Sequence, residues 1–336
     1  QPPVDASGPF GYLAEKASTN LMLQSEDFTT SWGFSYATVV ANAAVAPDGT
    51  TTMDKIEETA NTGSHIIAQT RTSGGGVPYT FSAYIKAGER GFAMLLLNDY
   101  GTGGVGQLKA IFDLSTGAVG TVSAGLTTAV EELPNGIYKC SIAFTPLSST
   151  NWNTQIGAAI SISSSNYLGE TGKGVYAWGA QLEQSTYPTS YIATTTTTVT
   201  RNADVLIAGD MVTDAAGSAY AEASQSAITF GGELLLSRDS AGRIIYNRFA
   251  SDPLSISSYD GTSVSGAPNG PSRDSTPISA ASTWGDQLTA YYNAVPDATP
   301  EPYSGTMGSG NLGIGNRDTG AGQWDGTIRE VKIFDS

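Results

Sequence analysis

The chain has 336 residues, and only 14% of them are charged, whereas glycine alone contributes 40. This length exceeds one ordinary hydrophobic core and suits two domains, and the low charge with many small and β-branched residues favours β-structure. The net charge of −15 argues against a nucleic acid or an anionic membrane as partner, and the single cysteine, Cys140, cannot form an intramolecular disulfide. Because no run of about 18 apolar residues is present, we expect no membrane insertion.

The N-terminal stretch "QPPVDASGPFGYLAEKASTN" is rich in proline and glycine. We expect residues 1–18 to form a linker or an anchoring segment. A first domain is then expected over residues 19–198. A change of composition near residue 200, where "ATTTTTVTRNAD" carries little core pattern, predicts an extended connector and a second domain over residues 199–336.

From Thr80 onward the chain shows short alternating strands separated by turn residues. "TFSAYIK" places Phe81, Ala83 and Ile85 on one side and Tyr84 on the other. "QLKAIFDL", "NGIYKCSIAF" and "NTQIGAAISIS" have the same two-residue period, and "NGIYKCSIAF" places Cys140 on a buried side. Regularly spaced strands of this kind predict β-sandwiches. The predicted fold class is therefore all-β, with two β-sandwich (jelly-roll) domains in tandem.

The strand "GVYAWGAQLE" contains Trp178, and its alternation predicts which of its side chains are buried. Alternation places Trp178 on one side with Tyr176, Ala180 and Leu182, and Gln181 on the other. A side that holds two aromatic rings and a leucine is the one to bury. We therefore predict that Trp178 is a core residue and that Gln181 is available to a ligand or an ion.

The first half of the chain resembles modules of bacteriophage structural proteins. The matching pieces include "YTFSAYIKAGER", "FDLSTGAVGTV", "NGIYKCSIAFT" and "GVYAWGAQLEQSTYPTSYIAT", which follow in the expected order within residues 12–195. Such modules look like jelly-roll carbohydrate-binding domains of phage head spikes, tail fibres and tail-tip proteins. The second half resembles a laminin G or concanavalin A-like sandwich through "SAYAEAS", "QLTAYYNAV", "NLGIGNRD" and "GQWDGTIREVKIFD".

This resemblance implies a virion surface protein that contacts host cell-surface polysaccharide and other virion proteins, as a homo-oligomer on the particle. The particle would be assembled in the host cytoplasm. A secreted bacterial carbohydrate-binding protein is the alternative for its localisation. A decoration protein that binds no glycan, and a polysaccharide-degrading enzyme, are the alternatives for its function.

Catalytic chemistry has few candidate residues in this chain. His65 is the one histidine, no Gly-x-Ser-x-Gly pattern accompanies it, and we interpret it as a strand-edge structural residue. A glycosidase needs only two carboxylates, but the Glu-x-Asp-x-x-Glu spacing of concanavalin-like glycosidases is not present. We interpret the acidic residues of "DKIEE" as solvated charges. The prediction is a non-catalytic protein that requires no cofactor.

A structural calcium ion is left open, since carboxylates and backbone carbonyls of β-sandwiches supply its ligands. The candidate metal ligands are Asp27 in "SEDF", and Asp318 and Asp325 in "GNRDTGAGQWDG". The alternative for each aspartate is a turn residue that caps its own backbone.

Carbohydrate binding uses exposed aromatic faces together with planar polar side chains. The candidates share a polar or loop setting in the sequence. They are Trp152 with Asn151 and Asn153 in "SSTNWNTQ", Tyr84, Tyr100, Gln181, and Asn316 with Arg317. Trp152 is the first candidate for a stacking platform, because we expect its segment to be a polar loop.

Overall fold

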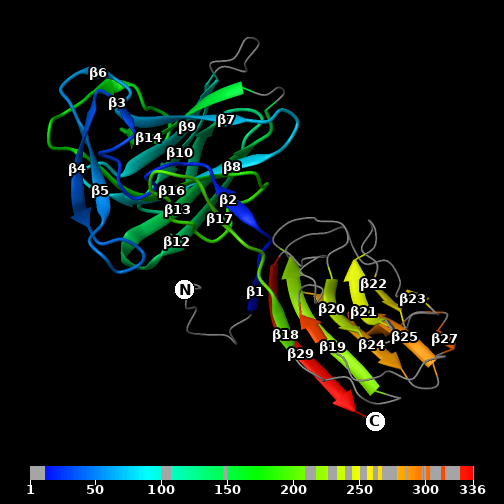
Figure 1. The fold of residues 1–336 in the computed structure, drawn as a ribbon. Helices are drawn as coiled ribbons and strands as arrows, with labels where there is room; N and C mark the ends of the chain where they lie inside the picture. The colour runs from blue at the N-terminus through cyan, green and yellow to red at the C-terminus, as the bar shows by residue number, and fades with distance from the viewer. Residues whose placement is uncertain are drawn as a thin grey trace. The chain divides into compact units, whose positions relative to one another are not determined.

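The computed structural model describes residues 12–99, 107–146, 150–208, 217–225, 233–238, 244–249, 256–259, 264–266, 278–284, 287–296, 298, 300–302, 312–314 and 326–335. The chain divides into two compact units, residues 18–201 and residues 1–17 with 202–336, whose elements are labelled in Figure 1. In the described part of the chain, the one helical element is the short 3-10 turn η1 (Pro134–Gly136). The prediction of an all-β chain with two β-sandwich units is confirmed.

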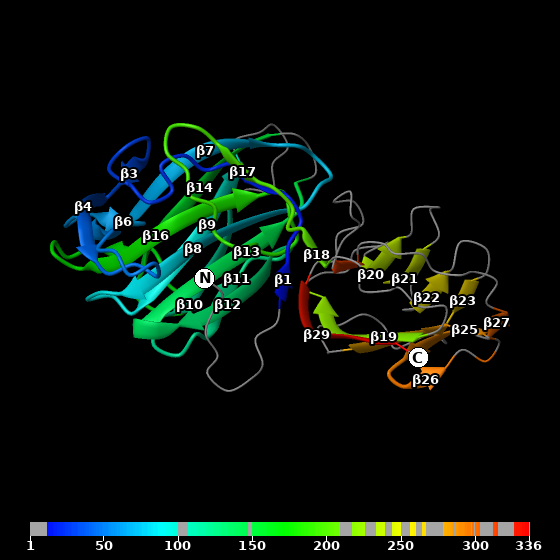
Figure 2. The same ribbon diagram turned by 60° about the horizontal axis from the view of Figure 1, so that its bottom comes forward.

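Two antiparallel sheets face each other in the unit of residues 18–201, and Figure 2 shows them from a second direction. Sheet I has the strand order β11 (Val119–Val122), β10 (Gln107–Asp113), β9 (Phe92–Asp99), β14 (Thr150–Ala159), β7 (Ile66–Ser73) and β3 (Gly33–Ser35). Sheet II has the order β12 (Thr127–Leu133), β13 (Ile137–Phe144), β8 (Tyr79–Ala87), β16 (Gly174–Glu183), β5 (Met53–Glu58) and β4 (Ala37–Ala44). Two short ladders join β15 (Tyr167–Leu168) to β6 (Thr62–Gly63), and β17 (Val199–Arg201) to β2 (Ser18–Asn20).

The hydrophobic core of this unit lies between the inner faces of sheets I and II. Phe81, Ala83 and Ile85 of β8 are fully buried there, as their alternation predicts. Each large apolar side chain buried in this way stabilises the fold by about 1.5–3 kcal/mol. Cys140 belongs to the same core, and burial raises the pKa of its thiol, so it packs as a small apolar residue.

The second unit also consists of two antiparallel sheets. One has the order β1 (Tyr12–Ala14), β29 (Gly326–Asp335), β19 (Gly217–Gln225), β24 (Ile278–Trp284), β25 (Gln287–Tyr292) and β26 (Val295–Pro296), with β27 (Glu301–Pro302) also pairing with β25. The other has the order β18 (Leu206–Ala208), β28 (Leu312–Ile314), β20 (Glu233–Arg238), β21 (Ile244–Phe249), β22 (Ile256–Tyr259) and β23 (Val264–Gly266). Strands β22 and β23 pack against β25 and so join the two layers.

The N-terminal segment corrects the expected domain organisation. We predicted a linker over residues 1–18, but Tyr12–Ala14 forms β1 and pairs antiparallel with β29 at the edge of the second unit. The backbone of Glu15 is bonded to Asp204 in the same unit, through N to Oδ2 (3.0 Å) and from Asp204 N to O (2.9 Å). The unit of residues 18–201 is therefore an insertion within the second unit, because the chain leaves that unit after residue 17 and returns at residue 202.

The structure holds no helix, within its described residues, that is long and apolar enough to cross a bilayer.

Candidate functional site

Trp152 is not an exposed platform, which corrects our first choice of stacking residue. Its segment is strand β14 and not a polar loop, and the Trp152 side chain is only 1% exposed. The indole lies in the core between the sheets and meets Phe144 edge-on at 4.9 Å. Period-two alternation explains the difference, because flanking polar residues on a strand point away from the residue between them.

Gln181 is also not available to a ligand. Its side chain is 1% exposed, its Oε1 accepts a bond from the Ile192 amide (2.8 Å), and its Nε2 donates to Glu183 Oε1 (2.8 Å). A β-bulge at Gly179, which has φ +64°, shifts the register of β16 between Trp178 and Gln181. The bulge reverses the phase of alternation and separates Trp178 from Ala180 and Leu182. Gln181 still lies opposite the core residue Leu182, but the segment of residues 190–192 covers it and its side chain bonds to that segment.

Trp178 is buried as predicted, but on the opposite face from the one expected. Val175 and Ala177 point into the core between the sheets, which leaves Trp178 on the outer face of sheet II. Tyr191 covers it there, with ring centroids 4.5 Å apart. Tyr84 shares this outer face, as expected, yet its ring packs against Trp178 at 5.4 Å and is partly buried.

The candidate metal ligands receive no support from the described residues. Asp27 is exposed and caps its own turn, since Oδ1 accepts from the Thr29 amide (2.9 Å) and Oδ2 accepts from the Thr30 hydroxyl (2.6 Å). Burial would raise the pKa of Asp27, but these hydrogen bonds outweigh it and lower the pKa. Among the residues that the structure describes, no three acidic, histidine or cysteine side chains gather in a way that could hold a metal ion.

Five predicted site residues lie outside the described residues, and their predictions stay predictions. They are Tyr100, Asn316, Arg317, Asp318 and Asp325.

Asn151 and Asn153 do reach the surface, on the outer face of sheet I. Strand pairing places Asn153 in one row with Asn98 on β9 and Thr70 on β7, and places Asn98 opposite Gln107 on β10. We call Gln107, Asn98, Asn153 and Thr70 the amide row. Gln107 and Thr70 are exposed, and the two asparagines are partly exposed.

The amide row presents uncharged hydrogen-bonding groups across four adjacent strands. Asn153 Nδ2 donates to Thr70 Oγ1 (3.2 Å) and its Oδ1 accepts from Gln155 Nε2 (2.5 Å), so its amide is held in one orientation. Two residues before Asn153 on the same face of β14, Asn151 accepts a hydrogen bond at Oδ1 from Thr72 Oγ1 (2.7 Å) and extends the polar surface. Asparagine is depleted in strands because it competes for backbone hydrogen bonds, so its repeated use here has a cost that folding alone does not explain.

An exposed apolar edge adjoins sheet I at β3. Phe34 on β3 is 49% exposed, Tyr36 is 47% exposed, and Leu168 on β15 is 64% exposed. We call these three residues the aromatic edge. Sequence reasoning missed it, although "GFSY" places two aromatic residues in a polar segment just after a glycine.

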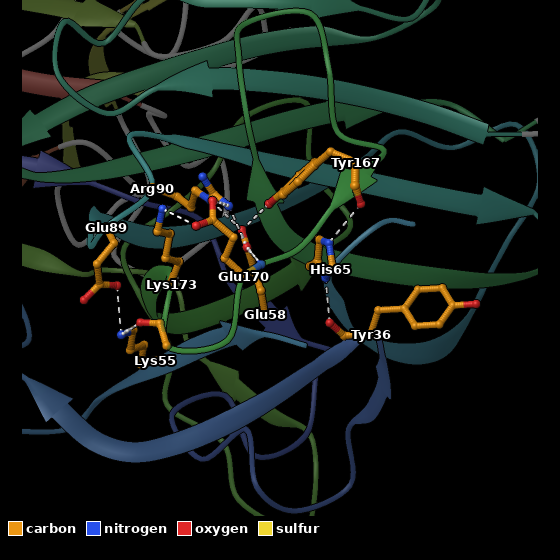
Figure 3. Close-up of polar contacts among 10 residues, drawn as sticks. Tyr36, Lys55, Glu58, His65, Glu89, Arg90, Tyr167, Glu170 and Lys173 are labelled. Carbon is orange, nitrogen blue, oxygen red and sulfur yellow. Dashed lines mark hydrogen bonds and ion pairs between the residues drawn. The ribbon is translucent and has the colours of Figure 1, made fainter. Parts of the chain in front are cut away.

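Tyr36 is held in a strained backbone conformation. Its φ of +49° lies in the left-handed region, which costs a non-glycine residue about 1–3 kcal/mol. Its carbonyl oxygen accepts bonds from the Thr59 amide (3.0 Å) and from His65 Nδ1 (2.7 Å), and its ring lies against Gly63, where any Cβ would collide with it. In Figure 3 the Tyr36 ring points away from the other labelled side chains. The exposed ring is thus fixed before any ligand arrives.

His65 is a structural residue in the described contacts, as predicted, although it is fully buried and not at a strand edge. Its ring contacts Tyr167 with centroids 4.7 Å apart, and its Nε2 lies 3.3 Å from the Tyr167 carbonyl oxygen. His65 therefore joins the segment of Tyr36 to the loop that carries Tyr167.

A buried ion pair anchors that loop (Figure 3). Arg90 donates from Nε to Glu58 Oε1 (2.7 Å) and from Nη2 to Oε2 (2.8 Å), while the Tyr167 hydroxyl and the Glu170 amide donate to the same carboxylate. Burial would raise the pKa of Glu58, but these bonds and the charge of Arg90 outweigh it and lower the pKa from 4.5 to about 2. The interpretation of "DKIEE" as solvated charges is wrong for Asp54 and Glu58, which are buried.

The Glu58 carboxylate has four donors and no open side, so its contacts stabilise the loop and offer no group to a substrate. An exposed ion pair within the same loop places Lys173 Nζ 2.7 Å from Glu170 Oε2. Two exposed groups remain available to a ligand: the amide row on the outer face of sheet I, and the aromatic edge at β3.

Comparison with known proteins gives no family assignment. No protein-family model matches the chain, and the comparison with curated protein sequences gives no match. Among solved structures, a match is found with domains LG4-5 of the mouse laminin alpha1 chain, at 9% identity over 98% of this chain and 91% of that chain, with a TM-score of 0.29. A similarity this distant carries no inference about function. The sheets described above are what define the β-sandwich units.

Proposed function

We propose that this protein is a non-catalytic glycan-binding protein and that the unit of residues 18–201 carries the binding surface. The observation that supports this most strongly is the amide row on the outer face of sheet I. Its two asparagines, Asn98 and Asn153, lie on β9 and β14, the two central strands of that sheet. Uncharged amides suit the paired hydroxyl groups of a neutral sugar, because each amide carries a donor and an acceptor side by side, and the amide of Asn153 is held in orientation.

The aromatic edge would provide the apolar contact with the sugar. Tyr36 and Phe34 expose ring surface to which the apolar C–H face of a sugar can stack. Phe34 pairs with Ile67, whose side chain faces the core, so the Phe34 ring lies on the opposite side of sheet I from the amide row and forms a separate contact at the edge of that sheet. Each contact is worth about 1 kcal/mol, and useful adhesion then requires many copies acting together.

A glycan array with the full chain in tetravalent form tests this proposal. Asn98→Ala with Asn153→Ala should weaken binding about 5- to 150-fold, because two hydrogen-bonding groups of about 0.5–1.5 kcal/mol each are lost. Thr127→Ala, an exposed position on β12 of the other sheet, is the matched control and should bind as the unchanged chain does. If no array glycan and no host-cell polysaccharide binds the tetravalent protein, the proposal is wrong.

The biological setting is also part of the proposal and rests on the sequence resemblance to phage virion modules. We propose a decoration, spike or fibre protein on a virion surface, oligomeric on the particle, that contacts host cell-surface polysaccharide and other virion proteins. No resident cofactor is required for this role. Electron microscopy of an intact particle would test it, and a secreted bacterial protein would instead be found free in the culture medium.

A purely structural role is the second candidate, and one observation favours it. Val119 and Val122 on the edge strand β11 are exposed, as are Ile160 and Ile162 next to it, and the Thr121 amide donates to the Ile162 carbonyl (3.0 Å). Because this bond already occupies part of the β11 edge, contact with another subunit would use these exposed apolar side chains. If Val119→Lys with Val122→Lys abolishes assembly while the glycan-array signal is absent in all forms, the structural role is the correct one.

A further inference from the structure

Arg71 has no anionic partner among the residues that the structure describes. It lies on β7, partly exposed, and its Nη1 donates to the Thr70 carbonyl (3.1 Å) while Nη2 donates to Gln69 Oε1. Its Nε is buried and has no hydrogen-bond partner, and no carboxylate pairs with the guanidinium within the described residues. Desolvation lowers the pKa of Arg71, which is the expected effect of burial on an uncompensated positive charge.

The guanidinium is also held in place. Gln69 is buried, its Oε1 accepts a second bond from the Leu23 amide (2.8 Å), and its Nε2 donates to the carbonyls of Leu23 (3.0 Å) and Ser31 (3.1 Å). The residue that orients Arg71 is therefore itself fixed by the segment of residues 23–31. A guanidinium oriented in this way loses little conformational entropy when it binds.

Trp152 lies directly opposite Arg71 in the β7–β14 ladder, so the two side chains share the inner face of sheet I. The Trp152 Nε1 is buried and has no acceptor either. A buried donor without a partner is rare in folded proteins and unfavourable. The two donors belong to one cross-strand pair beside an uncompensated positive charge, and an oxygen-bearing anion is the group that satisfies both the hydrogen-bonding and the charge.

We propose that Arg71 and Trp152 bind a carboxylate or another oxyanion at the end of β7 and β14. The anion neutralises the guanidinium and accepts hydrogen bonds from Arg71 Nε and Trp152 Nε1. The carboxylate of an acidic sugar and a free inorganic oxyanion share this chemistry. The site is separate from the amide row, which lies on the other face of the same strands, and it does not depend on the glycan-binding proposal.

Thermal unfolding of the full chain with sodium glucuronate, sodium sulfate, sodium chloride and glucose, at matched ionic strength, tests the proposal. Glucuronate or sulfate should raise Tm saturably, by about 3–6 °C at ten times its Kd, whereas chloride and glucose should not. Stabilisation by glucuronate alone identifies a sugar carboxylate, and stabilisation by sulfate alone identifies a free inorganic oxyanion. Equal stabilisation by chloride would overturn the proposal.

Three variants locate the effect. Trp152→Phe keeps an aromatic ring and removes the N–H, and Arg71→Met keeps the length of the stem and removes the charge; both should lose the anion-dependent rise in Tm. Lys86→Met, which removes a partly exposed cation on β8 of sheet II, should retain it. Without added anion, Arg71→Met should be at least as stable as the unchanged chain, because an unpaired charge is removed.

Asp99 is the register partner of Trp152 in the β9–β14 ladder, and its substitution tests whether the chain supplies its own counter-ion. If Asp99→Asn lowers Tm in anion-free buffer and Arg71→Met lowers it by the same amount, the protein supplies its own counter-ion and the proposal is wrong.

Nuclear magnetic resonance gives a readout at the site itself. The indole N–H signal that disappears in Trp152→Phe should shift with added glucuronate or sulfate, and a signal that does not move under either anion would also overturn it.

Discussion

Replacing Glu58 by glutamine removes one charge and keeps the shape of the side chain. The Glu58 side chain is fully buried and that of its partner Arg90 is only 11% exposed. A carboxyl group that ordinarily titrates at 4.5 titrates here at about 2, and each tenfold change in proton affinity corresponds to about 1.4 kcal/mol. The ionised Glu58 therefore contributes about 3 kcal/mol to the free energy of unfolding at pH 7. Loss of one partner of a buried pair costs a similar amount.

The pH dependence of the free energy of unfolding tests this prediction most directly. Because the folded-state pKa of Glu58 lies below the unfolded one, its stabilisation is complete above pH 4.5 and is lost as the pH falls toward 2. The glutamine variant has no such group. The difference in unfolding free energy between the two proteins should shrink from about 3 kcal/mol at pH 7 to about 1 kcal/mol at pH 2.5.

Hydrogen exchange of the β16 amides in increasing urea measures this difference, because it reports on the unit of residues 18–201 alone. Glu170→Gln is the matched control: its carboxylate pairs with Arg90 at 3.2 Å but is 56% exposed, so its loss should destabilise far less than the loss of the Glu58 charge. A Glu58→Gln variant within 1 kcal/mol of the unchanged chain at pH 7 would refute the reasoning. The same holds for a difference that does not change between pH 7 and pH 2.5.

Three further predictions follow from particular contacts. Gly179→Ala should destabilise by about 1–3 kcal/mol more than Gly125→Ala in urea unfolding; both have positive φ, but only at Gly179 does a Cβ meet a ring, that of Tyr84 at 2.8 Å. Gly63→Ala should displace the Tyr36 ring and abolish binding of any glycan that the array identifies, while Tm falls by only a few degrees. Deletion of residues 1–17 should speed hydrogen exchange in β29 and leave β8 unchanged, and equal protection of β29 in both forms would contradict the pairing with β1.

Much of the fold is readable from the sequence because period-two alternation is a local property. "TFSAYIK" shows its buried side directly, and the structure places Phe81, Ala83 and Ile85 in the core. The same logic fails at Gly179, because one extra residue in a bulge reverses the phase of every residue after it. Nothing in the letters "WGAQ" distinguishes a glycine that bends a strand from one that continues it.

The candidate site was only half predictable. Asn151 and Asn153 reach the surface, as predicted, whereas Trp152 between them was predicted to be exposed and is buried, because its segment is a strand and not the loop that we expected. The amide row also requires Asn98 and Thr70, which are distant in sequence and become neighbours only through the pairing of β9, β14 and β7. Register of this kind depends on which strands are adjacent, and that choice is made by the whole sheet.

By itself, the sequence determined the fold class, the approximate position of the boundary near residue 200, and the burial of Cys140 and of Phe81, Ala83 and Ile85. These follow from composition, turn residues and alternation, which act over a few residues. Only the tertiary structure decided that Tyr12–Ala14 belongs to the second unit, that Glu58 is buried against Arg90, and that Trp152 faces Arg71. Each of these depends on contacts between residues far apart along the chain, where the free energy of burial and pairing, and not local preference, selects the partner.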